Sequence, residues 1–434
     1  MDTINTDISA TVSTPPSLAQ ATRVWAKIGL LSFGGPAAQI ALMHKLIVEQ
    51  LRWLSEKEYI NALSFCMLLP GPEAMQLATY AGWKLHGKIG GFIAGLLFVL
   101  PGALVILALA MIYALLGDVP LIQALFLGVK AAVLIIVIES LLRIAKRALR
   151  SIDLKVLSVL AFIGIFFINI PYPLIVLFAA MYGFTKAGND TVDRSPVSKP
   201  GGFGKTVLTT VTMLCIWWLP MILLDYFFSD YQVLSEIGNF FSRLAVVTFG
   251  GAYAVLAYMG QDVVNHWGWL SAGEMMDGLG LAETTPGPLI LVTEFVGFLA
   301  AFRQGGMALG LAGAAITLWV TFIPCFLWIF AGAPYIEWIC AQPRLKGALE
   351  AISAAVVGVI LNLSVWFALH VMFTTVEAHQ YGIITLWQPE FSSIDWRVVF
   401  LALLCALLAF RLHWSIVKVL ALSSMLGTGM VMLF

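Results

Sequence analysis

The sequence predicts an all-α, polytopic membrane protein built from two homologous halves in inverted orientation, with broken or re-entrant helices. Three observations lead to this class. The 434-residue chain is 60% hydrophobic and only 11% charged, it contains long apolar runs, and it repeats several short motifs at a fixed spacing. A soluble domain carries about 25% charged residues, so the missing charge points to a lipid solvent.

Several apolar runs are long enough to cross a bilayer. A spanning helix needs about 20 consecutive apolar residues, and the runs at 90–116, 121–142, 207–228 and 308–330 meet this length. The first 21 residues are polar and rich in Thr and Ser, without the basic start of a signal peptide. We expect them to form a disordered cytoplasmic tail.

Short motifs recur 216 positions apart. Phe-Gly-Gly at 33–35 returns at 249–251, Trp-Leu-Ser at 53–55 returns at 269–271, and Pro-Gly-Pro at 70–72 returns at 286–288. Further along, Pro101 matches Pro324 and Ala-Ala-Val at 131–133 matches 354–356, at an offset of 223. One register across three motifs is not expected by chance, so the chain contains an internal duplication.

The duplication sets the expected domain organisation. We expect residues 22–184 to form the N-terminal repeat and residues 238–434 the C-terminal one. Between them, residues 185–237 contain a polar cytoplasmic linker and one extra transmembrane helix. A single additional crossing between two equal units turns the second unit upside down.

The distribution of basic residues supports this inversion. Arg143, Lys146, Arg147, Arg150 and Lys155 crowd one loop of the first half, which is cytoplasmic by the positive-inside rule. The stretch 156–184 that follows is then a hairpin that turns near 169–171. The equivalent loop of the second half, 371–395, contains acids and no Lys or Arg, so it is expected outside. Equivalent loops on opposite sides define an inverted repeat.

The glycine- and proline-rich motifs interrupt helices. Proline removes a backbone donor and clashes with the preceding turn. Each motif lies either at the tip of a hairpin that enters the membrane and returns, which we favour, or within a broken span. Interrupted backbone at membrane depth is tolerated only against protein or a wet cavity, and free N–H groups at helix starts bind anions. The alternative is that the interruptions are kinks used only for packing.

Two cations occupy equivalent positions. Lys27 and Arg243 each lie six residues before a Phe-Gly-Gly motif. A charge at membrane depth costs about 2.5–3.5 kcal/mol on insertion scales, which favours a use such as pairing with an anion. The alternative is that both are interfacial residues that reach toward water.

Polar side chains gather around the Pro-Gly-Pro motifs. Gln39 follows the first Gly-Gly-Pro, whereas Glu73 and Gln76 follow Pro72. In the second half, Thr284 and Thr285 come just before Pro286. Hydroxyl and amide groups can hydrogen-bond an oxyanion, but an ionised carboxylate repels one. The carboxyl groups of this region are therefore better suited to carrying protons; they are Glu73, Glu283 and Glu294.

Signals for other functions are absent from the sequence. The stretch Gly-Gly-Phe-Gly-Lys-Thr at 201–206 is similar to a phosphate loop, but Lys199 stands where that motif needs its first glycine. The zero net charge gives no pull toward nucleic acid. The five cysteines have no metal-binding or redox spacing. We therefore expect no enzyme activity, no metal and no cofactor.

The motifs resemble those of the chromate ion transporter family, in the long-chain form that carries both halves in one polypeptide. The resemblance rests on Phe-Gly-Gly-Pro-Ala-Ala-Gln-Ile (33–40), Leu-Pro-Gly-Pro-Glu-Ala-Met-Gln (69–76), Thr-Phe-Gly-Gly-Ala-Tyr-Ala-Val (248–255) and Ala-Glu-Thr-Thr-Pro-Gly-Pro-Leu (282–289). It implies export of chromate, a sulfate-like dianion, from the cytoplasm, with chromate resistance as the outcome. Sulfate or another small anion is the alternative substrate.

The sequence as a whole thus predicts a multi-pass secondary transporter in the cell inner (plasma) membrane. Its expected partners are the anion and membrane lipid, and the sequence is compatible with a homodimer. We expect the broken elements to converge on one anion site near the bilayer midplane. The candidate substrate-binding residues are Lys27, Arg243, Gly34, Gly35, Pro36, Gln39, Pro70, Gly71, Pro72, Glu73, Gln76, Gly250, Gly251, Thr284, Thr285, Pro286, Gly287 and Pro288. The candidate proton carriers are Glu73, Glu283 and Glu294.

Overall fold

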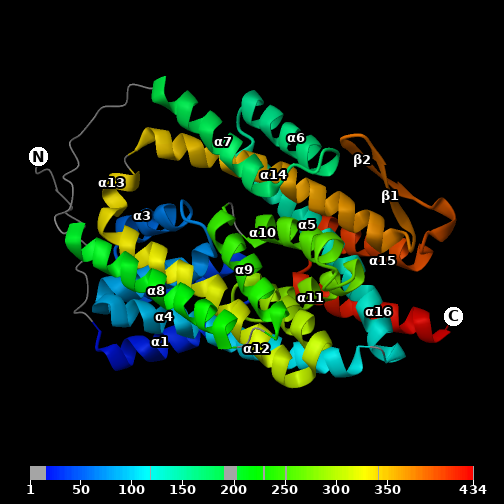
Figure 1. Ribbon diagram of the computed structural model, residues 1–434, viewed down its shortest axis with the longest axis horizontal. Helices are drawn as coiled ribbons and strands as arrows, with labels where there is room; N and C mark the ends of the chain where they lie inside the picture. The colour runs from blue at the N-terminus through cyan, green and yellow to red at the C-terminus, as the bar shows by residue number, and fades with distance from the viewer. Residues whose placement is uncertain are drawn as a thin grey trace, which may run out of the picture.

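The computed structural model describes residues 16–117, 119–189, 203–227, 230–249, 252–340 and 342–433. Within these ranges the regular structure is helical except for one β-hairpin (Figure 1). The predicted all-α class is confirmed, and the hairpin is an addition that the sequence analysis did not predict. Most of the predicted tail and linker, together with Gly250 and Gly251, falls outside the described residues.

The first half begins with short helices and ends with long ones. Its elements are α1 (Leu18–Leu31), α2 (Gly35–Met43), the π-helical turn η1 (His44–Gln50), α3 (Glu56–Cys66), α4 (Glu73–Leu116), α5 (Pro120–Ala148), α6 (Ile152–Phe166) and α7 (Tyr172–Lys186). A 3₁₀ turn, η2 (Ala187–Asn189), and the unpaired helix α8 (Phe203–Phe227) stand between the halves.

The second half repeats this order. Its elements are α9 (Gln232–Val247), α10 (Ala252–Gln261), η3 (Asp262–His266), α11 (Ala272–Thr284), η4 (Leu289–Leu291), α12 (Val292–Gly332), η5 (Ala333–Tyr335), α13 (Ile336–Cys340), α14 (Pro343–Met372), β1 (Val376–Tyr381), β2 (Ile384–Pro389), η6 (Phe391–Ser393), α15 (Trp396–Ala406), η7 (Leu407–Arg411) and α16 (Ile416–Leu433). The π-helical turns η1 and η3 occupy equivalent positions, so even an uncommon feature is duplicated.

The recurring Trp-Leu-Ser motif has a local structural role. Ser55 and Ser271 are the N-caps of α3 and α11, and each forms a capping box with the glutamate three residues later, Glu58 or Glu274. The serine side chain accepts from the glutamate N–H, while the glutamate side chain accepts from the serine N–H. The motif therefore marks where each of these helices begins.

Two of the long helices are in fact antiparallel hairpins. Gly87 in α4 and Gly306 in α12 have φ of 63° and 71° and interrupt the helical backbone. A Cβ placed on Gly82 would lie 2.4 Å from the Gly90 carbonyl oxygen, although residues eight apart in a straight helix are about 12 Å apart. The chain therefore reverses, and each element consists of a short leg (73–85 or 292–304) and a long leg (88–116 or 307–332).

The Pro-Gly-Pro motifs lie at the tips of re-entrant hairpins. At the base of the first hairpin, Lys84 pairs with Glu58 at 3.4 Å and joins the end of the short leg to the start of α3. The Arg303–Glu274 ion pair joins the equivalent positions of the second half. Since both ends of each hairpin meet at one level, the favoured prediction of re-entrant elements is confirmed for this pair.

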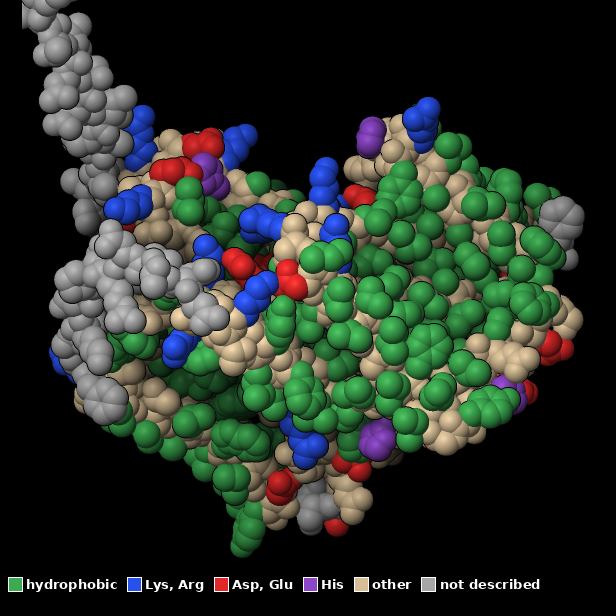
Figure 2. All heavy atoms as spheres, turned by 90° about the horizontal axis from the view of Figure 1, so that it is seen from above, with side chains coloured by type: hydrophobic (Ala, Val, Ile, Leu, Met, Phe, Trp, Pro, Cys, Tyr) green, Lys and Arg blue, Asp and Glu red, His purple; other side chains and the backbone are tan. Residues whose placement is uncertain are grey.

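The described residues contain six helices that are long and apolar enough to span a membrane: those in α4, α5, α8, the α12 region, α14 and α16. Hydrophobic side chains cover most of the face in Figure 2, whereas Lys and Arg gather toward one side. The most hydrophobic window of α14 is 72% buried and that of α8 only 17%. The chain is thus a multi-pass membrane protein with α14 inside and α8 at its edge.

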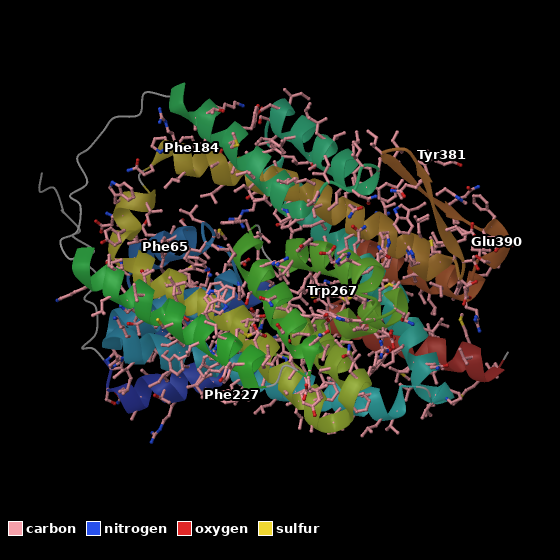
Figure 3. All side chains as sticks on the ribbon, viewed as in Figure 1. Phe65, Phe184, Phe227, Trp267, Tyr381 and Glu390 are labelled. Carbon is pink, nitrogen blue, oxygen red and sulfur yellow. The ribbon has the colours of Figure 1, made fainter. Side chains whose placement is uncertain are left out.

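The inverted arrangement is visible in one contact. The backbone N–H of Thr385 in β2 donates to the Phe167 carbonyl at 2.7 Å, and Asn169 Nδ2 donates to Thr385 Oγ1 at 2.6 Å. The loop with the β-hairpin, marked by Tyr381 and Glu390 in Figure 3, therefore lies beside the α6–α7 turn. In the first half, the loop at the equivalent place in the sequence is residues 149–151, and it lies at the other end of α6. Because α6 has 15 residues, its two ends are about 22 Å apart at 1.5 Å per residue.

An ion pair closes the opposite end of the α6–α7 hairpin. Lys186 at the end of α7 binds Asp153 at the start of α6. The hydrogen bond from the Lys186 ammonium holds the pKa of the Asp153 carboxyl below its usual range. This pair lies at the basic end that the sequence assigns to the cytoplasm.

The halves interlock through small residues. Helix α16 packs against α5 of the first half, and α7 packs against α14 of the second half. A Cβ on Gly427 would lie 2.8 Å from the backbone nitrogen of Gly128, and one on Gly183 would lie 2.1 Å from the Gly347 carbonyl oxygen. Small residues at such crossings let helix backbones approach closely in lipid.

This packing predicts different effects for two neighbouring glycines of α16. Gly427→Leu should lower stability by about 1–3 kcal/mol, because the new side chain meets the α5 backbone, which cannot yield as a side chain would. Gly429→Leu is the matched control, since a Cβ there meets nothing within 4 Å. Thermal unfolding of the detergent-purified variants measures the difference, and equal melting temperatures would contradict the packing.

Candidate functional site

The first interruption separates α1 from α2 at Ser32, Phe33 and Gly34. Gly34 and Gly35 have φ of 85° and 76°, values that L side chains rarely adopt, and Pro36 opens the first turn of α2. In the second half, α9 ends at Val247 and Thr248 follows. The Ser32 hydroxyl donates to the Ile28 carbonyl at 2.6 Å, and the Thr248 hydroxyl bonds to its own helix in the same way.

The Pro-Gly-Pro tips bring the two halves together. The Gly71 N–H donates to the Thr248 carbonyl at 2.9 Å, and the Gly287 N–H donates to the Ser32 carbonyl at 2.8 Å. Each tip is therefore bonded to the interruption of the other half, in two equivalent crossed hydrogen bonds. All six tip residues, 70–72 and 286–288, are buried.

The long legs support these tips at matching positions. Gly102 in α4 and Cys325 in α12 occupy equivalent places, each directly after the helix proline. A Cβ on Gly102 would lie 2.2 Å from the Pro286 carbonyl oxygen, and a Cβ on Gly71 would lie 2.9 Å from Cys325 Sγ. Each tip thus rests on the other half's long leg.

Two buried glutamines line this centre. Gln39 Nε2 donates to the Gly287 carbonyl at 2.6 Å and to the Ser32 carbonyl at 3.2 Å, while Gln76 Nε2 donates to the Pro70 carbonyl at 2.7 Å. Among the described residues, the Oε1 atom of neither glutamine has a hydrogen-bond partner. Each glutamine therefore leaves an acceptor for a water or a hydroxyl group. Their repeat equivalents, Val255 and Val292, are apolar.

The three candidate proton carriers differ in their surroundings. Glu73 opens α4 directly behind Pro72 and is half-buried. Glu283 is 7% exposed and accepts a hydrogen bond from the Tyr253 hydroxyl at 2.6 Å. Glu294 is 1% exposed, and neither of its carboxyl oxygens has a partner within the part of the chain that the structure describes. An ionised Glu294 would be a buried charge without compensation, which is costly.

The two predicted cations are not at this centre. Lys27 is exposed on α1. Arg243 is exposed on α9, where it lines a cavity of about 520 Å³ together with Asp225, Glu236, Asp262, His266 and Trp267, the last of which is labelled in Figure 3. The described residues give neither cation a hydrogen bond or an ion pair, and the two do not meet.

The two predicted threonines also differ. Thr284 is exposed, and its hydroxyl donates to the carbonyls of Gly280 and Leu281 in its own helix. Thr285 is buried beside the tip and donates to the Ala282 carbonyl at 3.2 Å. The structure thus joins the tips, Gln39, Gln76 and Thr285 at the centre, and leaves Thr284 at the surface.

Several groups of the site escaped the sequence analysis. Ser32, Thr248, Gly102 and Cys325 contribute contacts at the centre, and all four lie next to the repeated motifs at the same two offsets. Comparing the residues that directly flank each motif, at the same offsets, would have identified them. Tyr172, whose hydroxyl donates to the Phe249 carbonyl at 3.3 Å, carried no such signal.

A cavity also lies beside the β-hairpin. It measures about 830 Å³ and is bounded by the α6–α7 turn, η3 and the hairpin, with Tyr172 and Tyr258 in its wall. Because Tyr172 also bonds to Phe249 at the second interruption, this cavity ends close to the centre. None of the tip residues lines this cavity, and all of them are buried.

Comparison with known proteins gives a consistent result. A family model described as chromate transporter matches residues 19–184 and 235–428. The chromate transport protein of Cupriavidus metallidurans is 29% identical over 360 residues, which cover 82% of this chain and 84% of that protein. The chromate transport protein of Pseudomonas aeruginosa is 31% identical over 369 residues, 82% of each chain.

A third relative extends this range of organisms. The probable chromate transport protein of Synechococcus elongatus is 30% identical over 357 residues, which cover 79% of this chain and 83% of that protein. No solved structure matches the chain.

The crossed contacts predict that the tip glycine is indispensable. Gly71→Ala places a Cβ 2.9 Å from both Cys325 Sγ and Gln76 Nε2, in addition to the strain of a φ of 115°. Gly87→Ala is the matched control, because it has a φ of 63° and no neighbour within 4 Å. We expect Gly71→Ala to lower the melting temperature clearly more than Gly87→Ala. Equal losses would show that backbone strain alone, and not contact between the halves, governs this position.

Proposed function

The chain belongs to the chromate transporter family, and we propose that it is a secondary transporter that exports chromate from the cytoplasm across the cell inner membrane. Chromate resistance would be the outcome for the cell. The observation that supports this most is the meeting of two interrupted hairpins, one from each half, in a buried centre. Transporters built from inverted repeats bind substrate where discontinuous helices meet at the repeat interface.

Electrostatics favours export over import. Each charge that crosses 100 mV is worth about 2.3 kcal/mol, so a dianion that leaves a negative-inside cell gains about 4.6 kcal/mol. At about 1.4 kcal/mol per decade, this corresponds to a concentration ratio of roughly a thousand. Import of the same dianion would need about three co-transported cations. Membrane voltage alone can therefore drive the proposed reaction.

We assign the site residues roles that follow from their placement. The backbone at 34–36, 70–72 and 286–288 shapes the site. Gln39 and Gln76 would donate from Nε2 to the anion once these groups leave the backbone carbonyls to which they bond in this conformation. Gly250 and Gly251 have the same role by repeat equivalence. Glu73, Glu283 and Glu294 would repel a dianion if they were ionised, so we assign them to proton uptake.

Lys27 and Arg243 are proposed to attract the anion from opposite sides of the membrane. In an inverted repeat, equivalent residues of the two halves lie on opposite sides, and both side chains are exposed. Lys27 would then attract the anion on the cytoplasmic side, whereas Arg243 would do so on the external side. This arrangement needs no direct contact between the two cations.

Transport itself can be measured with purified protein in proteoliposomes loaded with chromate. We expect chromate efflux that rises with an inside-negative potassium–valinomycin potential and is absent from empty liposomes. The alternative substrate is tested by adding sulfate outside the vesicles in one arm and inside them in another. A sulfate carrier would transport the sulfate itself, and sulfate would compete with chromate and reduce its efflux. Chromate that stays inside protein-containing vesicles at every voltage would rule out the proposed function.

The two cations can be tested together. The double variant Lys27→Gln/Arg243→Gln should lose chromate transport while its protein level in the membrane stays unchanged, because both groups are exposed and carry no structural partner among the described residues. Lys155→Gln, which alters an exposed cation in the first turn of α6, is the control. Unchanged chromate efflux from the double variant would reject the assignment.

A further inference from the structure

A buried ionic cluster lies apart from the tips. Asp277 on α11 is 4% exposed, and its Oδ2 atom accepts a hydrogen bond from the Tyr113 hydroxyl at 2.9 Å. The Lys130 ammonium on α5 lies 3.5 Å from the same oxygen. Asp277 Oδ1 is buried without a partner among the described residues. No other carboxylate that forms an ion pair in the described chain is as deeply buried.

The cluster connects the two halves. Asp277 belongs to the second half, on the helix that leads into the second tip, whereas Tyr113 and Lys130 belong to α4 and α5 of the first half. The Tyr113 ring also packs against Phe295 of α12, with ring centroids 5.2 Å apart. Any movement of α11 away from the first half must therefore break this ion pair.

The repeat shows that this charge is not a requirement of the fold. The equivalents of Asp277 and Lys130 in the other half are Asn61 and Ser353, at the offsets of 216 and 223 that hold for the neighbouring motifs. Both equivalents are neutral. The chain thus has one buried charge pair where its symmetry allows two, so the two orientations of the inverted repeat are not energetically equivalent.

The remaining charged groups near Asp277 are few. Glu274 lies one turn earlier on α11 and is held by Arg303 of α12, which also donates to the Trp269 carbonyl. From the first half, Lys130 and Tyr113 face the carboxylate. The Lys130 side chain is 27% exposed, so the cluster has a route for proton exchange with water.

We propose that Asp277 is the site at which the transporter binds and releases a coupling proton. This inference rests on the proposed function. It adds Asp277 to the three glutamates as a proton-binding group, and makes it the one whose loss uncouples proton entry from chromate exit. With Asp277 ionised, the Lys130–Asp277 pair holds α11 against the first half. Separation of that pair would leave a buried charge without compensation, which is costly. A proton taken up by the carboxylate removes this charge and lets α11 move.

The proton balance is simple. A proton from the external water binds to the Asp277 carboxylate, α11 moves, and the same proton leaves to the cytoplasm when the pair with Lys130 forms again. One proton therefore enters for each chromate that leaves, and one unit of pH gradient shifts the chromate ratio about tenfold at zero voltage.

Chromate-loaded proteoliposomes with a trapped pH dye and the voltage clamped at zero test this proposal. Wild-type protein should couple chromate efflux to acidification of the lumen. Asp277→Asn should abolish this coupled acidification, whereas Asp277→Glu should keep it, because only the glutamate can bind and release a proton. The control is Glu377→Gln, which alters an exposed acid 3.4 Å from His379 on β1 and should behave as wild type.

The outcomes separate the two proposals. Wild-type protein that moves no chromate at any voltage would refute the proposed function itself. Chromate efflux from wild type without acidification, or acidification that persists in Asp277→Asn, would refute only the proton site. Loss of transport in both Asp277→Asn and Asp277→Glu, with both variants folded by thermal unfolding, would also refute it and assign Asp277 a structural role.

Discussion

The structure depends on one pair of hydrogen bonds that cross between the halves. The tip glycines Gly71 and Gly287 each donate to a carbonyl at the other half's interruption. In lipid, an unsatisfied backbone group costs several kcal/mol, so neither half can keep its interrupted backbone alone. The duplication solves this problem, because each half supplies the donors that satisfy the other. Everything else in the core, from the prolines of the long legs to the two glutamines, holds these four segments in place.

The same constraint explains why the centre can be both stable and mobile. Among the described residues, two backbone hydrogen bonds, the Gln39–Gly287 hydrogen bond and close glycine packing join the tips to the opposite half. These contacts are short-range and can be exchanged for contacts with an anion or water without unfolding a helix. By contrast, α5, α14, α7 and α16 interlock along their length through small residues. The exchangeable contacts thus lie at the hairpin tips, whereas the surrounding helices are joined by packing along their length.

Much of this organisation could be predicted from the sequence, because the duplicated motifs are still similar in the two halves. The 216-residue offset predicted the two halves, and the basic loop at 143–155 predicted their inversion. The re-entrant hairpins were predicted, but the exact positions of the reversals that follow them, Gly87 and Gly306, were not. Both glycines lie in short polar stretches just before an apolar run, where several residues could form the turn. The β-hairpin was missed because it has no counterpart in the first half. The convergence of the tips was predicted, but not that Gly71 would bond to Thr248, because pairing between halves depends on three-dimensional packing.

Polarity within the centre departs from the symmetry of the backbone. Gln39 and Gln76 correspond in the repeat to Val255 and Val292, and Glu294 corresponds to Ala78. The Asp277–Lys130 pair, which lies apart from the tips, corresponds to Asn61 and Ser353. A perfectly symmetric inverted repeat would have equal energies in its inward- and outward-facing states and could give no preference to either. Because the hydrogen bonds are symmetric and the charged groups are not, the backbone provides the two states and the side chains set the energy difference between them. Differential interaction with two states is what a ligand or a proton needs in order to shift their populations.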